Sequence, residues 1–224
     1  MSRRLRIHRL GSVPYAQALA VQEQLVTARI AGDIEDTLVL LEHPHVITLG
    51  RASRPEHVLL SAEHLAQLGI EVHETGRGGE VTYHGPGQLV GYPIVNLAPD
   101  RCDVRRYMES LEEILIRIAG AFDVEATRVP DLHGAWAQDR KIGAVGVRIR
   151  QWVTMHGFAL NVTTDLDAYQ LIVPCGITDK GVTSLLRETG RAIAMDDVIE
   201  VAVRVAADVL GGEPILTESW PTLP

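Results

Sequence analysis

The sequence contains little cysteine and no long apolar run. Its 224 residues include two cysteines, Cys102 and Cys175, which lie far apart in different contexts, so we expect free thiols rather than a disulfide framework. No apolar stretch approaches the roughly 18 residues that a membrane-spanning helix requires. The basic N-terminus lacks the apolar segment and the small-residue cleavage site of a secretory signal. We therefore expect a cytoplasmic protein with no membrane partner.

Lysine is also scarce, and basic residues are fewer than acidic ones. Of the 21 basic residues, 19 are arginines and only two, Lys141 and Lys180, are lysines. With 29 acidic residues the formal net charge is −8 at pH 7, which argues against nucleic acid as a nonspecific partner. Codon composition is the simplest explanation of the arginine bias. Lysine can nevertheless lose its proton or act as a compact point charge, so both retained lysines are candidates for a chemical role.

The nine histidines do not form a recognisable metal motif. His43 and His45 flank a proline, whereas His84 and His156 stand alone in glycine-containing stretches. No pair has a familiar zinc spacing with cysteine, and no acidic cluster accompanies them. We therefore expect no metal site. His84 is expected to line a pocket or order a loop, and His156 to be a hydrogen-bonding residue of the core.

Length and hydrophobicity predict one domain with a core of its own, because 46% of the residues are hydrophobic. Apolar spacings of three and four residues predict a helix that begins near Pro14 and ends at Gly32. They also predict a strongly amphipathic helix from 104 to 122, capped by Asp103, and a last helix over 196–210. Short apolar or alternating runs predict strands over 5–10, 36–42, 46–49, 70–73, 88–97 and 153–162, with a short helix capped by Ser61 and a hairpin about a turn at 139–141.

Short links between consecutive strands favour antiparallel and mixed pairing. The expected fold class is therefore α+β, a mixed α/β composition in a single domain whose largely antiparallel mixed sheet is flanked by helices. We assign this domain to residues 1–212. The Pro-containing tail, residues 213–224, is expected to lie on the surface or to be weakly ordered. Residues 165–184 show no regular pattern.

Residues 76–92 are exceptionally rich in glycine, with six glycines among seventeen positions. Glycine permits positive φ and lets a ligand approach the main chain closely, and so dense a run is not typical of an ordinary helix or strand. A simple pair of turns between strands is the alternative. Arg77, His84 and Gln88 alternate with the glycines and must end up near each other, which favours a binding loop.

Cys175 and Lys141 are the residues best suited to nucleophilic chemistry. Pro174 and Gly176 flank Cys175 and can present its thiol at a bend, although a free cysteine is more often a small buried hydrophobe. A nearby ammonium that lowers a thiol pKa from about 8.5 to about 7 stabilises the thiolate by roughly 2 kcal/mol. Lys141 precedes a Gly/Ala-rich strand, but it is also a candidate for an ordinary exposed turn lysine. Lys180 lies in a turn-like stretch where Asp179 and solvent can satisfy it.

Three segments resemble one family, the lipoyl (octanoyl) transferases of lipoate biosynthesis. They are RGGEVTYHGPGQLVGYPIVNL (77–97), RKIGAVGVRIRQWVTMHGFALNV (140–162) and IVPCGITDKGVTSL (172–185), with EHPHVITLGR (42–51) as a weaker match. Together they cover the chain from about residue 36 to 187. The resemblance implies a fold like the catalytic domain of biotin and lipoate protein ligases. One departure is Ile47, which stands where many members carry an aromatic residue.

The resemblance also implies an activity. An octanoyl group would pass from octanoyl-acyl carrier protein to a lysine of lipoyl domains, in 2-oxoacid dehydrogenase complexes and in the glycine cleavage H protein, with no cofactor. Cys175 falls on the family's acyl-thioester cysteine, and Lys141 on the lysine that assists it. The segments that fall on the family's acyl-binding positions comprise Arg77, Gly78, Gly79, Glu80, Val81, Thr82, Tyr83 and His84, then Ala144, Val145 and Gly146, and then Gly157, Phe158 and Ala159.

Three other functions remain open from the residues alone. An ATP-dependent lipoate or biotin ligase also uses a glycine-arginine loop and a lysine, but it activates a free acid and needs no cysteine. A cysteine thioester hydrolase would use Cys175 with His84 or His156 and release free acid. A catalytically inactive carrier-protein or lipid-binding module would have no need of both Cys175 and Lys141.

Overall fold

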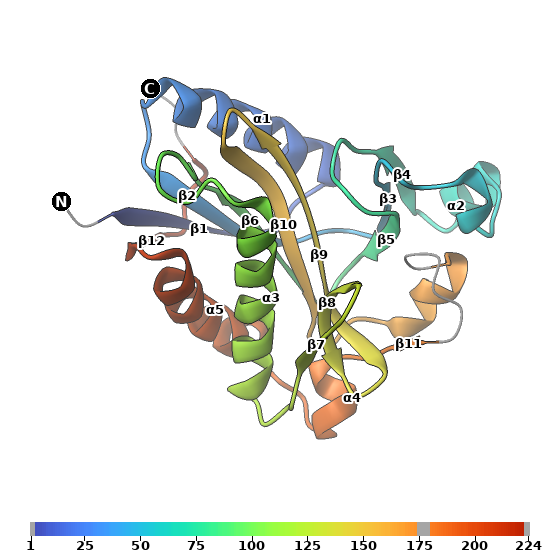
Figure 1. Ribbon diagram of the computed structural model, residues 1–224. Coiled ribbons are helices and arrows are strands. Elements are labelled where there is room, and N and C mark those ends of the chain that lie inside the picture. The colour runs from blue at the N-terminus through green and yellow to red at the C-terminus, as the bar shows by residue number, and fades with distance from the viewer. Residues whose placement is uncertain (1–2, 174–179, 222–224) are drawn as a thin grey trace.

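The computed structural model describes residues 3–173 and 180–221. In this part of the chain nine strands form a main sheet in the order β12-β1-β2-β6-β10-β9-β8-β7, with β11 paired to β9 (Figure 1). The pairs β2–β6, β6–β10, β10–β9, β9–β8 and β8–β7 are antiparallel, whereas β1 pairs in parallel with β2 and β12. The expected mixed, largely antiparallel sheet is therefore confirmed. The strands are β1 (Arg4–Ser12), β2 (Asp36–Glu42), β6 (Gln88–Ile94), β7 (Thr127–Val129), β8 (Leu132–Ala137), β9 (Arg140–Arg150), β10 (Val153–Asn161), β11 (Gly181–Val182) and β12 (Glu213–Thr217).

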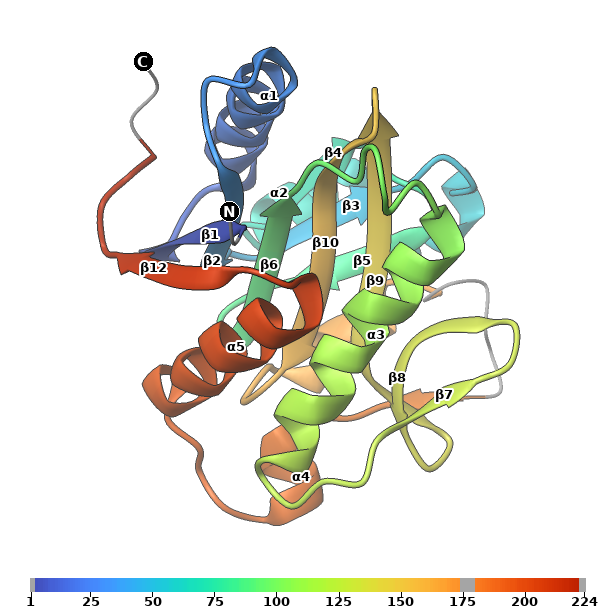
Figure 2. The same ribbon diagram turned by 60° about the vertical axis from the view of Figure 1, so that its left-hand side comes forward.

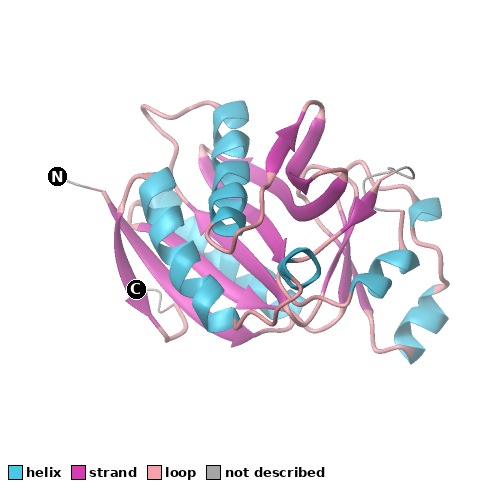
Figure 3. Cartoon of the chain, turned by 90° about the horizontal axis from the view of Figure 1, so that it is seen from below, coloured by secondary structure: helices cyan, strands magenta, loops and turns pink. Residues whose placement is uncertain are grey.

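Helices cover both faces of this sheet (Figures 2 and 3). α3 (Val104–Gly120) and α5 (Met195–Leu210) pack on one face over the larger apolar core, and α1 (Tyr15–Ala31) packs on the other. α3 forms where it was predicted, because Asp103 caps it by accepting a hydrogen bond from the Arg106 amide. α1 ends where Gly32 adopts a left-handed conformation with φ of 86°. The shorter helices are η1 (Pro55–His57), α2 (Ala62–Gln67), η2 (Leu166–Leu171) and α4 (Leu185–Thr189).

A small second sheet has the order β4-β3-β5, formed by β4 (Glu71–Glu74), β3 (Val46–Leu49) and β5 (Val81–His84). β5 lies inside the glycine-rich stretch, so the stretch contains a strand that its sequence did not predict. Residues 76–79 make the loop, and the four residues from Val81 then pair antiparallel with β3, with Val46 opposite His84. Five of the six glycines thus lie in the two bends on either side of β5, and Gly91 lies within β6.

Two other local expectations differ from the structure. The hairpin turn before β9 is Gln138–Asp139, with Gln138 at φ of 56°, so Arg140 and Lys141 are strand residues rather than turn residues. The segment expected as a tail begins with β12, which pairs in parallel with β1 from Arg4 opposite Glu213 onward. Its side chains are mostly exposed, which is why the hydrophobic pattern did not predict this edge strand.

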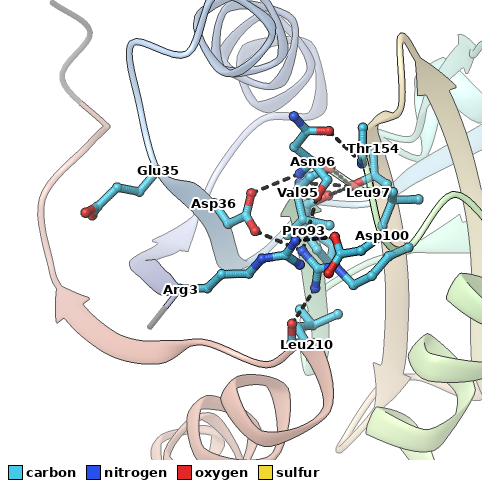
Figure 4. Close-up of polar contacts among 12 residues, drawn as sticks. Arg3, Glu35, Asp36, Pro93, Val95, Asn96, Leu97, Asp100, Thr154 and Leu210 are labelled. Carbon is cyan, nitrogen blue, oxygen red and sulfur yellow. Dashed lines mark hydrogen bonds and ion pairs between the residues drawn. The ribbon is translucent and has the colours of Figure 1, made fainter. Parts of the chain in front are cut away.

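Asp36 anchors the start of β2 to three other parts of the chain (Figure 4). Its carboxylate accepts hydrogen bonds from Arg29 Nε at 2.8 Å, from the Asn96 amide at 2.9 Å and from Arg101 Nη2 at 3.3 Å. Arg101 also donates to the Leu210 carbonyl at 2.6 Å, at the end of α5. Asp36 is only 8% exposed, so its carboxylate joins α1, the segment after β6 and, through Arg101, the end of α5 where little solvent screens it.

Asp36→Ala is expected to lower the free energy of unfolding by about 3 kcal/mol, because it leaves two half-buried guanidinium groups without their shared carboxylate. The matched control is Glu109→Ala, which breaks the exposed pair of Glu109 with Arg105 and should change stability by no more than about 0.5 kcal/mol. Urea unfolding of the two variants gives the comparison. Equal effects of the two substitutions would contradict the anchoring role.

Candidate active site

A cavity of about 420 Å³ lies beside β9 and β10 and is bounded by the glycine-arginine loop, β5, β6 and the first turn of α1. It is in the size range of small-molecule sites. Lys141 and thirteen of the fourteen predicted substrate-binding residues line it. The structure thus brings residues 77–84 against the two neighbouring strands that carry residues 144–146 and 157–159. The predicted lining residues are Arg77, Gly78, Gly79, Glu80, Val81, Thr82, His84, Ala144, Val145, Gly146, Gly157, Phe158 and Ala159.

Tyr83 is the predicted residue that the structure places elsewhere. Its ring is fully buried in the small core behind β5, and its hydroxyl lies 2.6 Å from His45 Nδ1. Strand alternation explains this placement, because Thr82 and His84 face the cavity and the residue between them faces away.

Small residues on facing strands create the space for the cavity. Gly146 of β9 lies opposite Gly157 of β10, and Ala144 lies opposite Ala159. A Cβ atom on Gly146 would lie 3.3 Å from Arg77 Cδ and from the Gly78 carbonyl oxygen, so a larger residue would push against the loop. The Gly78 amide donates to the Val147 carbonyl at 2.9 Å and fixes the loop to β9.

Arg77 holds this loop together from inside. Its side chain donates to the Thr48 carbonyl at 2.8 Å, to the Thr48 hydroxyl at 2.9 Å and to the Gly78 carbonyl at 3.1 Å. Gly50 makes room for it, since a Cβ atom there would lie 2.2 Å from the Gly79 carbonyl oxygen and 2.8 Å from Arg77 Nη1. A buried guanidinium in contact with three acceptors stiffens the cavity wall.

A polar network runs from the cavity into the protein. His84 Nδ1 lies 2.7 Å from Gln88 Oε1, which confirms that these two residues of the glycine-rich stretch come together. Gln88 Nε2 donates to Asn161 Oδ1 at 2.9 Å, and Asn161 Nδ2 donates to the Thr183 carbonyl at 2.9 Å. A second cavity of about 20 Å³ between Thr82, Lys141, Asn161 and Tyr169 can hold one water molecule.

Both lysines lie against one aromatic ring. Lys141 Nζ is 5.0 Å and Lys180 Nζ is 5.9 Å from the centroid of the buried Trp136 indole, within the range of cation–π contacts. Trp136 lies opposite Lys141 in the β8–β9 ladder. Lys180 is therefore half-buried beside the indole and is not simply a turn lysine in solvent. Lys141 also lines the large cavity, whereas Lys180 does not.

Cys175, the predicted nucleophile, lies outside the described residues. Cys102 is exposed just before α3, and its Sγ lies 3.6 Å from the Leu97 carbonyl oxygen. It does not line the cavity of about 420 Å³, so its thiol lies outside this site.

Ten further residues line the cavity and were not predicted as site residues. Several are sequence neighbours of predicted site residues, such as His156 directly before Gly157, and that position could have indicated them. Most come from distant elements, so no local pattern marked them. They are Tyr15, Val90, Tyr92, Val104, Met108, Asp131, Leu132, His133, Val147 and His156.

Buried histidines next to the cavity are held neutral. Burial is the largest cause that lowers the pKa of His43 to about 4 and the pKa values of His84 and His156 to about 3. The nearby Arg77 and Arg148 guanidinium groups lower the pKa of His156 further. Burial also raises the pKa of Tyr15 to about 12. Near neutral pH these side chains are therefore uncharged.

No group of three or more metal-binding side chains is found in residues 3–173 and 180–221. Within the same residues, no helix has the length and apolar character needed to cross a membrane.

Comparison with known families matches residues 14–207 to the family described as "Lipoyl protein ligase A/B catalytic domain". The chain belongs to this family. An octanoyltransferase from Solibacter usitatus is 49% identical over 207 residues, covering 92% of this chain and 93% of the relative. One from Chloroflexus aurantiacus is 48% identical over 215 residues, covering 95% and 96%. One from Myxococcus xanthus is 47% identical over 93% of this chain, which spans 60% of that relative.

Solved structures with low sequence identity share the fold. A putative lipoate protein ligase from T. acidophilum superposes with a TM-score of 0.77 at 16% identity, covering 98% of this chain and 90% of the other. A biotin protein ligase from Aquifex aeolicus gives a TM-score of 0.52 at 12% identity, covering 92% and 68%. The family resemblance and the fold expected from it are both confirmed.

The neutral histidines predict a loss of stability in acid. Because their folded pKa values lie below the unfolded value of about 6.5, the unfolded chain binds protons that the folded chain does not. The free energy of unfolding should therefore fall as pH drops from about 6.5 toward 4. His156→Gly should reduce the loss between pH 7 and pH 5 by about 2 kcal/mol. Urea unfolding at both pH values measures this difference.

The matched control is Met155→Leu, a substitution at the neighbouring buried position that removes no ionisable group. Its pH dependence should equal that of the wild type. If His156→Gly retained the full acid sensitivity, His156 would not be held neutral in the folded protein.

Proposed function

We propose that this protein transfers an octanoyl group from octanoyl-acyl carrier protein to a lysine of a lipoyl domain, through a thioester on Cys175. The observation that carries the proposal is the convergence of the three predicted acyl-binding segments and Lys141 on one apolar cavity. Relatives named octanoyltransferase at 47–49% identity support the reaction type. The assignment of Lys141 and the lining residues rests on the motif positions together with this geometry, and that of Cys175 rests on its motif position.

The cavity suits a linear saturated chain. Small side chains on β9 and β10, chiefly Ala144, Gly146 and Ala159, leave room for a chain against the backbone. Burying seven methylene or methyl groups contributes roughly 5 kcal/mol at about 0.8 kcal/mol each, before the costs of ordering the chain. That contribution is enough to select a medium-length acyl group over a short one.

The chemistry divides into two acyl transfers. The Cys175 thiolate attacks the thioester carbonyl of the donor, a new C–S bond forms, and the carrier thiol leaves. The ε-amine of the acceptor lysine then attacks the enzyme thioester, giving an amide and returning the Cys175 thiol. Lys141 stabilises the thiolate by its charge and exchanges a proton with the incoming amine. Because a thioester is converted to an amide, the reaction runs downhill without ATP.

The acceptor class has support from a fold neighbour. A bi-partite lipoate protein ligase from Thermoplasma acidophilum, described with its E2 lipoyl domain, superposes with a TM-score of 0.75 at 18% identity. We propose that lipoyl domains, including those of 2-oxoacid dehydrogenase complexes and the glycine cleavage H protein, are also the acceptors here. The carrier-protein donor is proposed from the family motifs, and relatives named octanoyltransferase support transfer of an octanoyl group.

An ATP-dependent ligase is the nearest alternative, because a lipoate-protein ligase A described as bound with ATP shares the fold with a TM-score of 0.74. The two reactions differ in their substrates. Incubation with octanoate and ATP should leave a lipoyl domain unmodified, whereas incubation with octanoyl-carrier protein alone should add one octanoyl group. The opposite result would replace the proposed transferase by a ligase.

Cys175→Ala is expected to abolish both the acyl-enzyme and transfer, because no other group would carry the octanoyl chain. Intact-mass spectrometry after incubation with octanoyl-carrier protein should show one octanoyl adduct on the wild type. Cys102→Ala is the matched control and should retain the adduct. An adduct that persists on Cys175→Ala protein would refute the assignment.

Lys141→Ala should slow alkylation of Cys175 by iodoacetamide at neutral pH, with partial recovery at alkaline pH where the thiolate forms unaided. Lys141→Arg should restore transfer poorly, since a guanidinium keeps the charge but does not readily release a proton. Lys180→Ala is the matched control, because it removes the second ammonium at Trp136 but not the one that lines the cavity. A larger effect of Lys180→Ala would reverse the two roles.

A further inference from the structure

The cavity has an aromatic wall, which we define as Tyr15, His84, Tyr92 and His156. Part of this wall lies far from Lys141 along the sheet. His156 pairs with Val147 in the β9–β10 ladder, and Val147 is six residues beyond Lys141 on β9. At about 3.3 Å per residue, that separation is roughly 20 Å. An acyl chain whose carbonyl lies near Lys141 and that runs along β9 therefore points its methyl end toward this wall.

The rings of the aromatic wall brace one another. Tyr15 stacks on His84 with an interplanar angle of 8° and a centroid distance of 6.4 Å, and Tyr92 meets His156 edge-on at 6.4 Å. Behind the wall, His43 Nε2 lies 2.7 Å from the Tyr92 hydroxyl, and His43 Nδ1 lies 2.6 Å from the Val13 carbonyl oxygen. These contacts fix the rings from three strands and a helix, so they resist displacement by a ligand.

His156 combines three unusual features. It is a non-glycine residue with φ of 57° in the middle of a strand, its side chain is 3% exposed, and its Nε2 has no hydrogen-bond partner among the described residues. Its backbone amide donates to Gln22 Oε1 at 2.8 Å, which ties the strained residue to α1. Strained residues of this kind persist where the surroundings fix them, and they cluster at ligand sites.

We propose that Tyr15, Tyr92 and His156 set the longest acyl chain that the cavity accepts. This inference rests on the proposed function, because it takes the ligand to be a saturated acyl chain. Up to the wall, each added methylene increases affinity about fourfold. A longer chain has to displace these braced, tightly packed rings, and the cost typical of overpacking lowers affinity about tenfold or more.

The test uses direct binding of free fatty acids, which needs no thioester chemistry. Calorimetric titration of the full chain with octanoate, decanoate and dodecanoate should show affinity that stops rising, and then falls, beyond a limiting length. Tyr15→Ala and His156→Gly should raise the ratio of dodecanoate to octanoate affinity by about tenfold, the worth of one to two methylenes. Glycine adopts positive φ freely, so His156→Gly removes the imidazole without backbone strain. Circular dichroism checks that each variant folds, and either variant alone is enough for the test if the other does not fold.

Two matched controls distinguish the removal of a ring of the aromatic wall from any other enlargement of the cavity. Tyr15→Phe keeps the ring and should keep the wild-type ratio. Met108→Ala enlarges the cavity on the side of α3 and should also keep that ratio. An unchanged ratio in both enlarging variants, or an equal shift in Met108→Ala, would overturn the proposal.

Failure of the proposed function has a different signature. If fatty acids bind with this length dependence but no octanoyl group reaches a lipoyl domain, the transferase assignment fails and the aromatic wall stands. If transfer occurs and the length order is insensitive to Tyr15→Ala and His156→Gly, the wall fails and the transferase stands.

Discussion

The close approach of the glycine-arginine loop to β9 is the constraint on which the site depends. The Gly78 amide bonds to the Val147 carbonyl at 2.9 Å, and a Cβ atom on Gly146 would already press on Arg77. Gly50 has no space for any side chain, because the Gly79 carbonyl oxygen would lie 2.2 Å from its Cβ. Backbone can pack against backbone here only because side chains are missing. The small sheet is thereby held over the main sheet, and the cavity lies between them.

That arrangement places polar groups in surroundings with little water. The structure reduces the cost of burying them in two ways. Arg77, Gln88 and Asn161 have fixed hydrogen-bond partners, so their burial adds rigidity instead of leaving unpaired groups. His84 and His156 remain uncharged, because burial lowers their pKa values to about 3. The result is a stiff, largely apolar cavity whose walls would not need to be ordered when a ligand binds.

Local signals in the sequence gave much of the fold. The Asp103 cap with its apolar stripe predicted α3, Gly32 predicted the end of α1, and Asp36–Glu42 formed a strand with the expected bounds. Features that depend on a distant partner were missed. β5 exists because Val81–His84 finds β3, and β12 exists because residues 213–217 find the edge of β1. Neither short segment carries a sequence pattern that predicts its strand, since strand formation depends on what lies opposite.

For the site, the sequence by itself determined the chemistry that is available: an arginine-glycine loop, two small-residue strands, two lysines and a cysteine between proline and glycine. The reactivity of the side chains and the backbone flexibility of glycine are properties of the residue types and do not depend on the fold. Only the tertiary structure decided that Lys141 lines the cavity while Lys180 shares its indole, that Tyr83 faces away, and that Tyr15 and His156 close the space. These outcomes follow from strand register and from packing between segments over a hundred residues apart, and neither is encoded in any local stretch of the chain.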